Sequence, residues 1–289
     1  MKESITITDN RSGESIEIPI EHGGVDSGPW TKFLPGIWFK DEGFAATAVT
    51  NSSITYIDGG AGQLEYRGYR IEDLAKKSTF TEVAYLLVHG ELPTSDSLEE
   101  WNTQLARHAH LDDQQNENLL KAFNSQSHPM GMFTAGLAAL STLYPDARDV
   151  EDPEIRQKHV LNAISKVPTL AASAAAYRNG YSGAQSNDEL SYIENFLSMA
   201  FSSPKEPFQS NPTFTKALDQ LLILHADHEQ NCSTSTVRIV GSSHASLYTS
   251  VSAGIAALWG PLHGGANQAV IEMLENIRKD SGDVEKYVE

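Results

Sequence analysis

Histidines gather in one part of the sequence. Residues 225–270 hold four of the ten histidines and the only cysteine of the chain. His225 and His228 follow an apolar pattern, "ALDQLLILHADHE", that is typical of a helix. Because the two histidines are three positions apart, they share one helix face if the helix continues as far as His228. Such a pair can bind a metal ion, form part of a hydrogen-bonded core, or belong to a catalytic pocket that binds an anion.

The residues around the pair favour the catalytic pocket. The metal site has little support, because "HADHE" differs from H-E-x-x-H and no third ligand follows at a familiar spacing. Polar side chains come directly after the apolar helix, namely His228, Asn231, Ser233, Thr234, Ser235 and Thr236. These residues can line an anion-binding pocket, and the alternative is that they form a long solvated loop.

A further candidate is His263, in the stretch "LWGPLHGGANQAV". The Gly-Pro pair is expected to end one helix, and Gly264 and Gly265 to permit unusual backbone angles and close approach of a substrate. An amphipathic helix is predicted over about 266–279, so His263 lies near its N-terminus. The helix dipole and desolvation both favour a neutral imidazole there. A neutral imidazole can donate a hydrogen bond to a carbonyl and stabilise an enolate, whereas the alternative is a turn histidine bonded to the backbone.

The rest of the sequence predicts a mainly helical fold that would position these side chains. Alternating isoleucines around Gly13 predict a β-hairpin over residues 5–20, and a second short hairpin is predicted around Gly59 and Gly60. Thr79 or Ser78 is expected to start a helix that stops at Gly90. Further helices are predicted over about 95–110, 112–124, 130–143, 153–178, 187–203 and 211–225.

Three of the helical stretches, at about 130–143, 164–176 and 250–258, are rich in small residues. Alanine and glycine on a helix face let two backbones approach closely. This pattern indicates either close packing within one chain or a helix–helix interface between subunits.

Composition excludes several classes of protein. The chain has 21 Lys and Arg against 38 Asp and Glu, a net charge of −17, which argues against nucleic acid or an anionic membrane as a partner. One cysteine excludes an internal disulfide framework and predicts a reducing, cytoplasmic location. The first residues lack the apolar core of a signal peptide, and no apolar run is long enough to span a membrane.

Taken together, the motifs resemble those of the citrate synthase family, in its bacterial, often hexameric, branch. The matching stretches run in order through the chain, over residues 54–75, 87–94, 128–130, 221–243 and 258–270. The resemblance implies a multi-helical large domain with short N-terminal β-hairpins. It predicts an N-terminal hairpin region over 1–60 packed on a large domain over 61–270, with a hinge and the start of a smaller domain over 271–289.

The resemblance also implies a reaction. Members of this family condense acetyl-CoA with oxaloacetate to citrate and CoA, without a metal or other cofactor, as homodimers or as a hexamer or larger assembly of dimers. His263 matches the histidine that donates a hydrogen bond to the thioester oxygen. His228 matches a histidine that binds oxaloacetate, Asn231 resembles a supporting polar neighbour, and His225 is expected to be structural or to support the pocket from behind.

The sequence also departs from the family pattern. The motif G-[YF]-G-H-x-[VI]-x-[RK], followed by D-P-R, is absent, as are the catalytic aspartate and the substrate-binding arginines that follow it. A short helix predicted from Asp283 would end within two turns. We therefore expect a truncated chain that lacks the small domain and is inactive as the 289-residue piece. The alternatives are a 2-methylcitrate synthase, or a shortened, non-catalytic paralogue with an assembly or regulatory role.

Overall fold

The computed structural model describes residues 3–42, 44, 46–124, 126–181, 185–203, 205–280 and 282. The chain divides into two compact units, Met1–Ser53 and Ile54–Glu289. The predicted helix from Asp283 lies outside the described residues, and the predicted domains 1–60, 61–270 and 271–289 stay a prediction.

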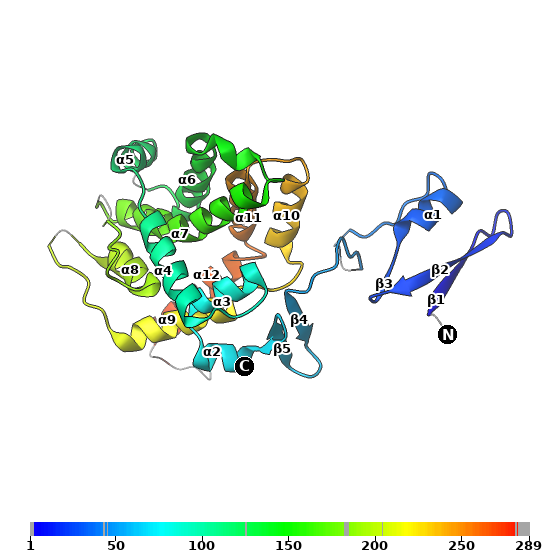
Figure 1. Ribbon diagram of the computed structural model, residues 1–289, viewed down its shortest axis with the longest axis horizontal. Helices are drawn as coiled ribbons and strands as arrows, with labels where there is room; N and C mark the ends of the chain where they lie inside the picture. The colour runs from blue at the N-terminus through cyan, green and yellow to red at the C-terminus, as the bar shows by residue number, and fades with distance from the viewer. Residues whose placement is uncertain are drawn as a thin grey trace. The chain divides into compact units, whose positions relative to one another are not determined.

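The first unit contains a three-stranded antiparallel sheet in the order β1-β2-β3 and one short helix (Figure 1). The strands are β1 Ser4–Thr8, β2 Ser15–Glu21 and β3 Gly24–Val25, and the helix is α1 Ser27–Phe33. Ile5 pairs with Ile18, which is 1% exposed, so the alternating isoleucines face one side as predicted. Gly13 turns the chain at φ +80°. The helix α1 was not expected, and its start is capped by the Asp26 carboxylate.

The second unit begins with the other predicted hairpin. Strands β4 Thr55–Asp58, β5 Gln63–Tyr66 and β6 Tyr69–Arg70 form an antiparallel sheet in that order. Tyr66 is fully buried in an apolar cluster with Ile71, Leu74, Val83, Leu86 and Ile223. The hairpin is therefore anchored by its last residue in the helical core.

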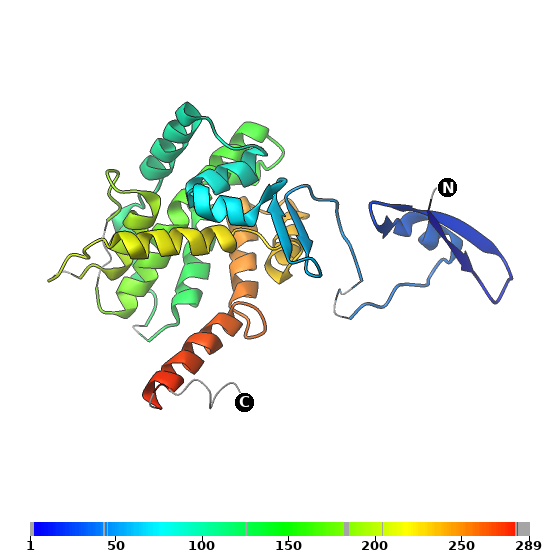
Figure 2. The same cartoon turned by 90° about the horizontal axis from the view of Figure 1, so that it is seen from below.

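Helices make up most of the second unit, which confirms the mainly α fold (Figures 1 and 2). They are α2 Ile71–Lys77, α3 Phe80–His89, α4 Ser95–His108, α5 Asp113–Lys121, α6 Pro129–Leu143, α7 Pro153–Arg178, α8 Tyr192–Phe201, α9 Pro212–Leu224, α10 Cys232–Gly241, α11 Leu247–Leu258 and α12 Gly265–Lys279, with a 3₁₀ turn at Pro145–Arg148. Among the described residues, no helix is both long and apolar enough to cross a membrane.

Local capping explains several boundaries. Thr79 and Glu82 form a reciprocal capping box at the start of α3, and Gly90 ends it at φ +92°, as predicted. The helix predicted over 187–203 begins only at Tyr192, because Ser191 and Glu194 form a second capping box there. The helix α10 was not expected, since its first turns read as a polar run.

The small-residue helices pack against their neighbours within the chain. A Cβ at Gly136 on α6 would lie 3.0 Å from Leu170 Cδ2 on α7. A Cβ at Gly254 on α11 would lie 2.6 Å from Val237 Cγ2 on α10. Close packing within one chain therefore accounts for these two glycines, and the predicted subunit interface stays a prediction.

Candidate active site

The loop after α9 holds the first pair of histidines. The helix ends at Leu224, so His225 and His228 do not share a helix face. His225 is exposed, and its Nδ1 lies 2.7 Å from the Leu221 carbonyl oxygen. A carbonyl oxygen only accepts, so His225 Nδ1 donates this hydrogen bond. The same carbonyl also accepts the His225 backbone N–H at 3.1 Å, so the ring bonds to the end of its own helix, and the expected structural or supporting role of His225 stays a prediction.

His228 lies at the centre of a tight turn. The Asp227 Oδ2 atom accepts a hydrogen bond from the Glu229 N–H at 3.0 Å, which closes the turn around the histidine. Glu229 adopts the left-handed region at φ +54°. The His228 side chain is exposed, and its ring makes no hydrogen bond within the described part of the chain. The turn is thus held through its backbone while the imidazole is presented to solvent.

Asn231 begins the helix α10. Its Oδ1 atom accepts a hydrogen bond from the Thr234 N–H at 2.9 Å, as an N-cap residue does. Most of the polar run that follows serves the helix itself. Ser235 Oγ donates to the Asn231 carbonyl, and Thr236 Oγ1 donates to the Cys232 carbonyl. The hydroxyl groups of Ser235 and Thr236 therefore belong to the first turns of a helix. Neither a long loop nor a pocket wall is needed to explain these two residues.

Ser233 is the exception, because it reaches His263. Its Oγ atom lies 2.9 Å from His263 Nε2 and 2.9 Å from the Gly254 carbonyl oxygen. The hydroxyl has one proton, so it donates to one of these atoms at a time. When it donates to Gly254, the His263 Nε2 atom must carry a proton, and when it donates to Nε2, the neutral ring carries its proton on Nδ1. In both cases Nδ1 is the nitrogen left for a ligand.

His263 is held on the tight turn between α11 and α12, as predicted. The His263 N–H donates to the Gly260 carbonyl at 3.0 Å, and the ring is half-buried. The expected unusual angles are wrong for Gly264, which has an ordinary helical φ of −64°. A Cβ there would lie 2.4 Å from the Leu258 carbonyl oxygen, and one at Gly265 would lie 3.0 Å from the Gly260 carbonyl oxygen. These glycines are required because two segments of backbone approach closely, and not because of their φ angles.

Comparisons with known proteins show which family this chain belongs to. A sequence model described as "Citrate synthase, C-terminal domain" matches residues 43–289. The chain belongs to the citrate synthase family. Citrate synthase 1 of Mycobacterium tuberculosis is 47% identical over 98% of this chain, and a citrate synthase of Dictyostelium discoideum is 43% identical over 96%.

Solved structures support the family fold. A citrate synthase from Pyrobaculum aerophilum superposes with a TM-score of 0.74 at 34% identity, covering 81% of this chain and 59% of that one. The Thermotoga maritima enzyme gives 0.69 at 32% identity, covering 83% and 61%. The chain spans 66% of the length of the mycobacterial relative and 56% of that from Dictyostelium.

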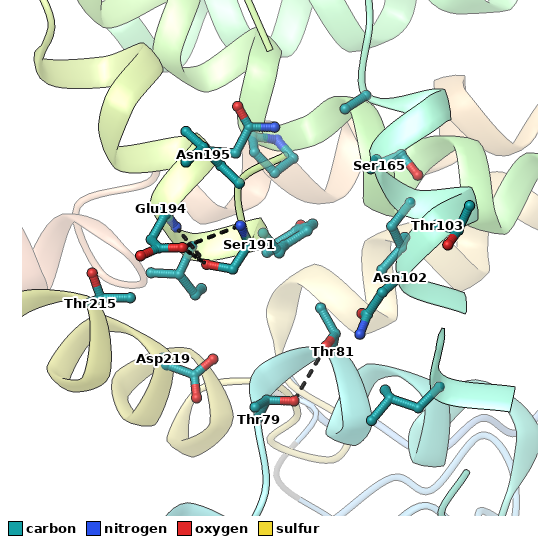
Figure 3. A pocket seen from close by; sticks show the side chains of 18 of the residues that line it. Thr79, Thr81, Asn102, Thr103, Ser165, Ser191, Glu194, Asn195, Thr215 and Asp219 are labelled. Atoms are coloured by element: carbon teal, nitrogen blue, oxygen red, sulfur yellow. Dashed lines mark hydrogen bonds between the residues drawn. The ribbon is translucent and has the colours of Figure 1, made fainter. Parts of the chain in front are cut away.

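A large groove lies elsewhere in the second unit, and the histidines predicted for the active site do not line it. It has a volume of about 1040 Å³ and is lined by residues of α2, α3, α4, α7, α8 and α9 (Figure 3). Some of its polar groups are used by the fold: Ser191 bonds to Glu194, and Asp219 accepts from the Phe80 N–H at 2.9 Å. Burial raises the pKa of the Asp219 carboxyl. His225, His228 and His263 do not line this groove, so we place the candidate site at the loop after α9, the start of α10 and the turn after α11.

No motif in the sequence indicated how Ser233, Gly254 and Asp227 act. Ser233 was named only as one of six polar residues, and its position on the inner face of α10 distinguishes it from Ser235. An N-cap signal at Asn231 could have revealed the helix and hence that face. Within the described ranges, no three His, Cys, Asp or Glu side chains gather closely enough to hold a metal ion.

Proposed function

We propose that the protein containing this chain condenses acetyl-CoA with oxaloacetate and water to give citrate and CoA, the first step of the tricarboxylic acid cycle. The observation that carries the proposal is the hydrogen bond between Ser233 and His263, in a chain of the citrate synthase family. The names of the relatives at 43–47% identity support the same reaction.

In the proposed reaction, His263 stabilises the enolate of the thioester. Loss of a methyl proton from acetyl-CoA leaves negative charge on the thioester oxygen, and a nearby neutral donor lowers the energy of that state. In the arrangement that the reaction uses, Ser233 donates its hydroxyl proton to His263 Nε2 instead of to the Gly254 carbonyl, so that Nδ1 carries the proton offered to the substrate. The enolate carbon then attacks the ketone of oxaloacetate, and water hydrolyses the resulting thioester to citrate and CoA.

His228 is proposed to bind oxaloacetate before the chemistry begins. Its ring is exposed and free of hydrogen bonds within the described residues, so it can donate to a carboxylate or ketone oxygen. Asn231 supports this end of the site by starting α10 beside the loop. The base and the second histidine of the family belong to motifs that this sequence does not contain.

Assembly and location form part of the same proposal. We propose a homodimer, and a hexamer of the bacterial type as the larger assembly, acting in the cytoplasm without a metal or other cofactor. The helix α12 supports a partner surface, because Val270, Ile271, Met273 and Leu274 on it are each at least 44% exposed. The single cysteine supports a reducing compartment.

The test is an assay of CoA release in a protein of the relatives' full length that contains this chain. Acetyl-CoA with oxaloacetate should release CoA, and EDTA should leave the rate unchanged. Propionyl-CoA should be the poorer substrate, and a preference for it would identify a 2-methylcitrate synthase instead. No CoA release from either thioester would overturn the proposal in favour of a non-catalytic role.

A further inference from the structure

We propose that Tyr66 and Thr55, on the β4–β5 hairpin, are positioning residues that set His228 in place by clamping Asp227. The inference rests on the proposed function, because it concerns the residue assigned there to oxaloacetate. Both residues lie in the stretch 54–75, for which the sequence indicated no role in the site, and neither needs to touch the substrate.

Tyr66 holds the backbone on one side of His228. Its hydroxyl donates to the Asp227 carbonyl oxygen at 3.0 Å and accepts from the Asp227 N–H at 3.3 Å. One phenol thus satisfies both backbone groups of the residue that precedes the histidine. The Tyr66 ring is fully buried, and burial raises the pKa of its hydroxyl, so the phenol stays protonated and able to donate.

Thr55 holds the side chain of the same aspartate. Thr55 and Tyr66 are directly opposite in the antiparallel register of β4 and β5, so their side chains lie on one face of the hairpin. The Thr55 hydroxyl donates to Asp227 Oδ2, and this same oxygen accepts the Glu229 N–H. The clamp therefore extends through the carboxylate to the residue that follows His228.

The two contacts fix the peptide groups on both sides of the histidine. Asp227 is held by three hydrogen bonds to the Tyr66 and Thr55 hydroxyls. Glu229 is held at an unfavourable left-handed φ of +54° by the Asp227 carboxylate. The exposed ring of His228 has no hydrogen bond within the described residues that could set its place instead. The position from which it meets a ligand thus depends on a hairpin more than 150 residues earlier in the chain.

The first experiment compares Tyr66→Phe and Thr55→Val with Tyr56→Phe as the matched control. Tyr56 is next to Thr55 on β4, but its side chain is 53% exposed. In a protein of the relatives' full length that contains this chain, loss of one clamp hydrogen bond should raise KM for oxaloacetate about threefold to tenfold. The value of kcat and KM for acetyl-CoA should change less than about twofold, and the Tyr56→Phe protein should match the parent.

A double-mutant cycle separates positioning from a general loss of structure. In a His228→Ala background, Tyr66→Phe should raise KM for oxaloacetate no further, since the residue it positions is gone. Equal effects of Tyr66→Phe in both backgrounds would overturn the proposal. So would equal losses in kcat and in KM for both substrates, because these would indicate a disturbed fold.

A second measurement needs no activity. In the 289-residue chain, exchange of the Asp227 and Glu229 amide hydrogens should be faster in Tyr66→Phe than in Tyr56→Phe, by about threefold to tenfold. Faster exchange in a protein that does not bind oxaloacetate would support the clamp and contradict the proposed function. Unchanged exchange would overturn the clamp, whatever the kinetics show.

Discussion

The two halves of the candidate site hold their histidines in opposite ways. His263 is bonded at its ring, where Ser233 occupies Nε2 at 2.9 Å. His228 is held only through its neighbours, by contacts to Asp227, and its ring is exposed. A histidine that must offer a proton from one particular nitrogen needs its other nitrogen bonded. A histidine that meets a substrate on binding needs only a fixed backbone and an open ring.

The backbone around His263 and the backbone around His228 are also held in different ways. One side of the His263 turn contacts α10 and α11, where there is no room for a Cβ at Gly254 or Gly264. The His228 loop lies between a helix end and a helix start and is tied to a hairpin. Rigid packing thus sets one half of the site, and a few hydrogen bonds set the other.

The largest effect is expected from His263→Ala. It should lower turnover by about 10² to 10³, because a preorganised donor to the enolate is lost. Oxaloacetate affinity should change little, since the interaction appears only as charge develops. Steady-state kinetics in a protein of the relatives' full length, with calorimetric titration of oxaloacetate, measures both. Near-normal turnover would end the assignment of His263 as this donor.

For His228→Ala we expect the opposite of the His263→Ala result, namely weaker oxaloacetate binding with a smaller loss of turnover. Loss of a hydrogen bond to a charged substrate should weaken oxaloacetate binding by about 10- to 100-fold, with a smaller effect on turnover at saturation. His225→Ala is the control, because its ring serves the end of α9. If His263→Ala and His228→Ala change binding and turnover alike, the two halves of the site do not have separate roles.

A smaller effect is expected from Ser233→Ala. Without the hydroxyl, His263 Nε2 loses the donor whose hydrogen bond favours a proton on Nδ1, and turnover should fall about threefold to tenfold. Ser235→Ala removes a hydroxyl from the same helix that bonds only to residues beside the helix start, so it should leave turnover unchanged. The ring nitrogen shifts of His263 in NMR spectra should change in the first variant and not in the second.

The smallest effect concerns packing rather than chemistry. Gly254→Ala places a Cβ 2.6 Å from Val237 Cγ2 and should lower the free energy of unfolding by about 1–3 kcal/mol. Ala256→Leu, on the exposed side of α11, should change it by less than about 0.5 kcal/mol in the monomer. Urea denaturation checks both, and sedimentation of Ala256→Leu tests whether this face of α11 lies in the proposed dimer.

Local patterns were sufficient for much of the fold. The hairpins, the capping box at Thr79 and the stop at Gly90 were predicted because each depends on residues within a few positions. The helix α10 was missed because polar residues at a helix start resemble those of a loop. The start of α8 was placed too early because the Ser191 cap was not recognised.

The sequence by itself determined the family, the type and order of most elements, and the two histidines proposed for chemistry, because motifs and periodicity are local properties. Tertiary structure alone decided what holds those histidines. Ser233 and His263 are 30 residues apart, and Tyr66 and Asp227 are 161 residues apart. Such pairs meet only when α10 packs on α11 and when the hairpin is buried against α9. A hydrogen bond between distant residues depends on that packing, and no local pattern in the sequence specifies it.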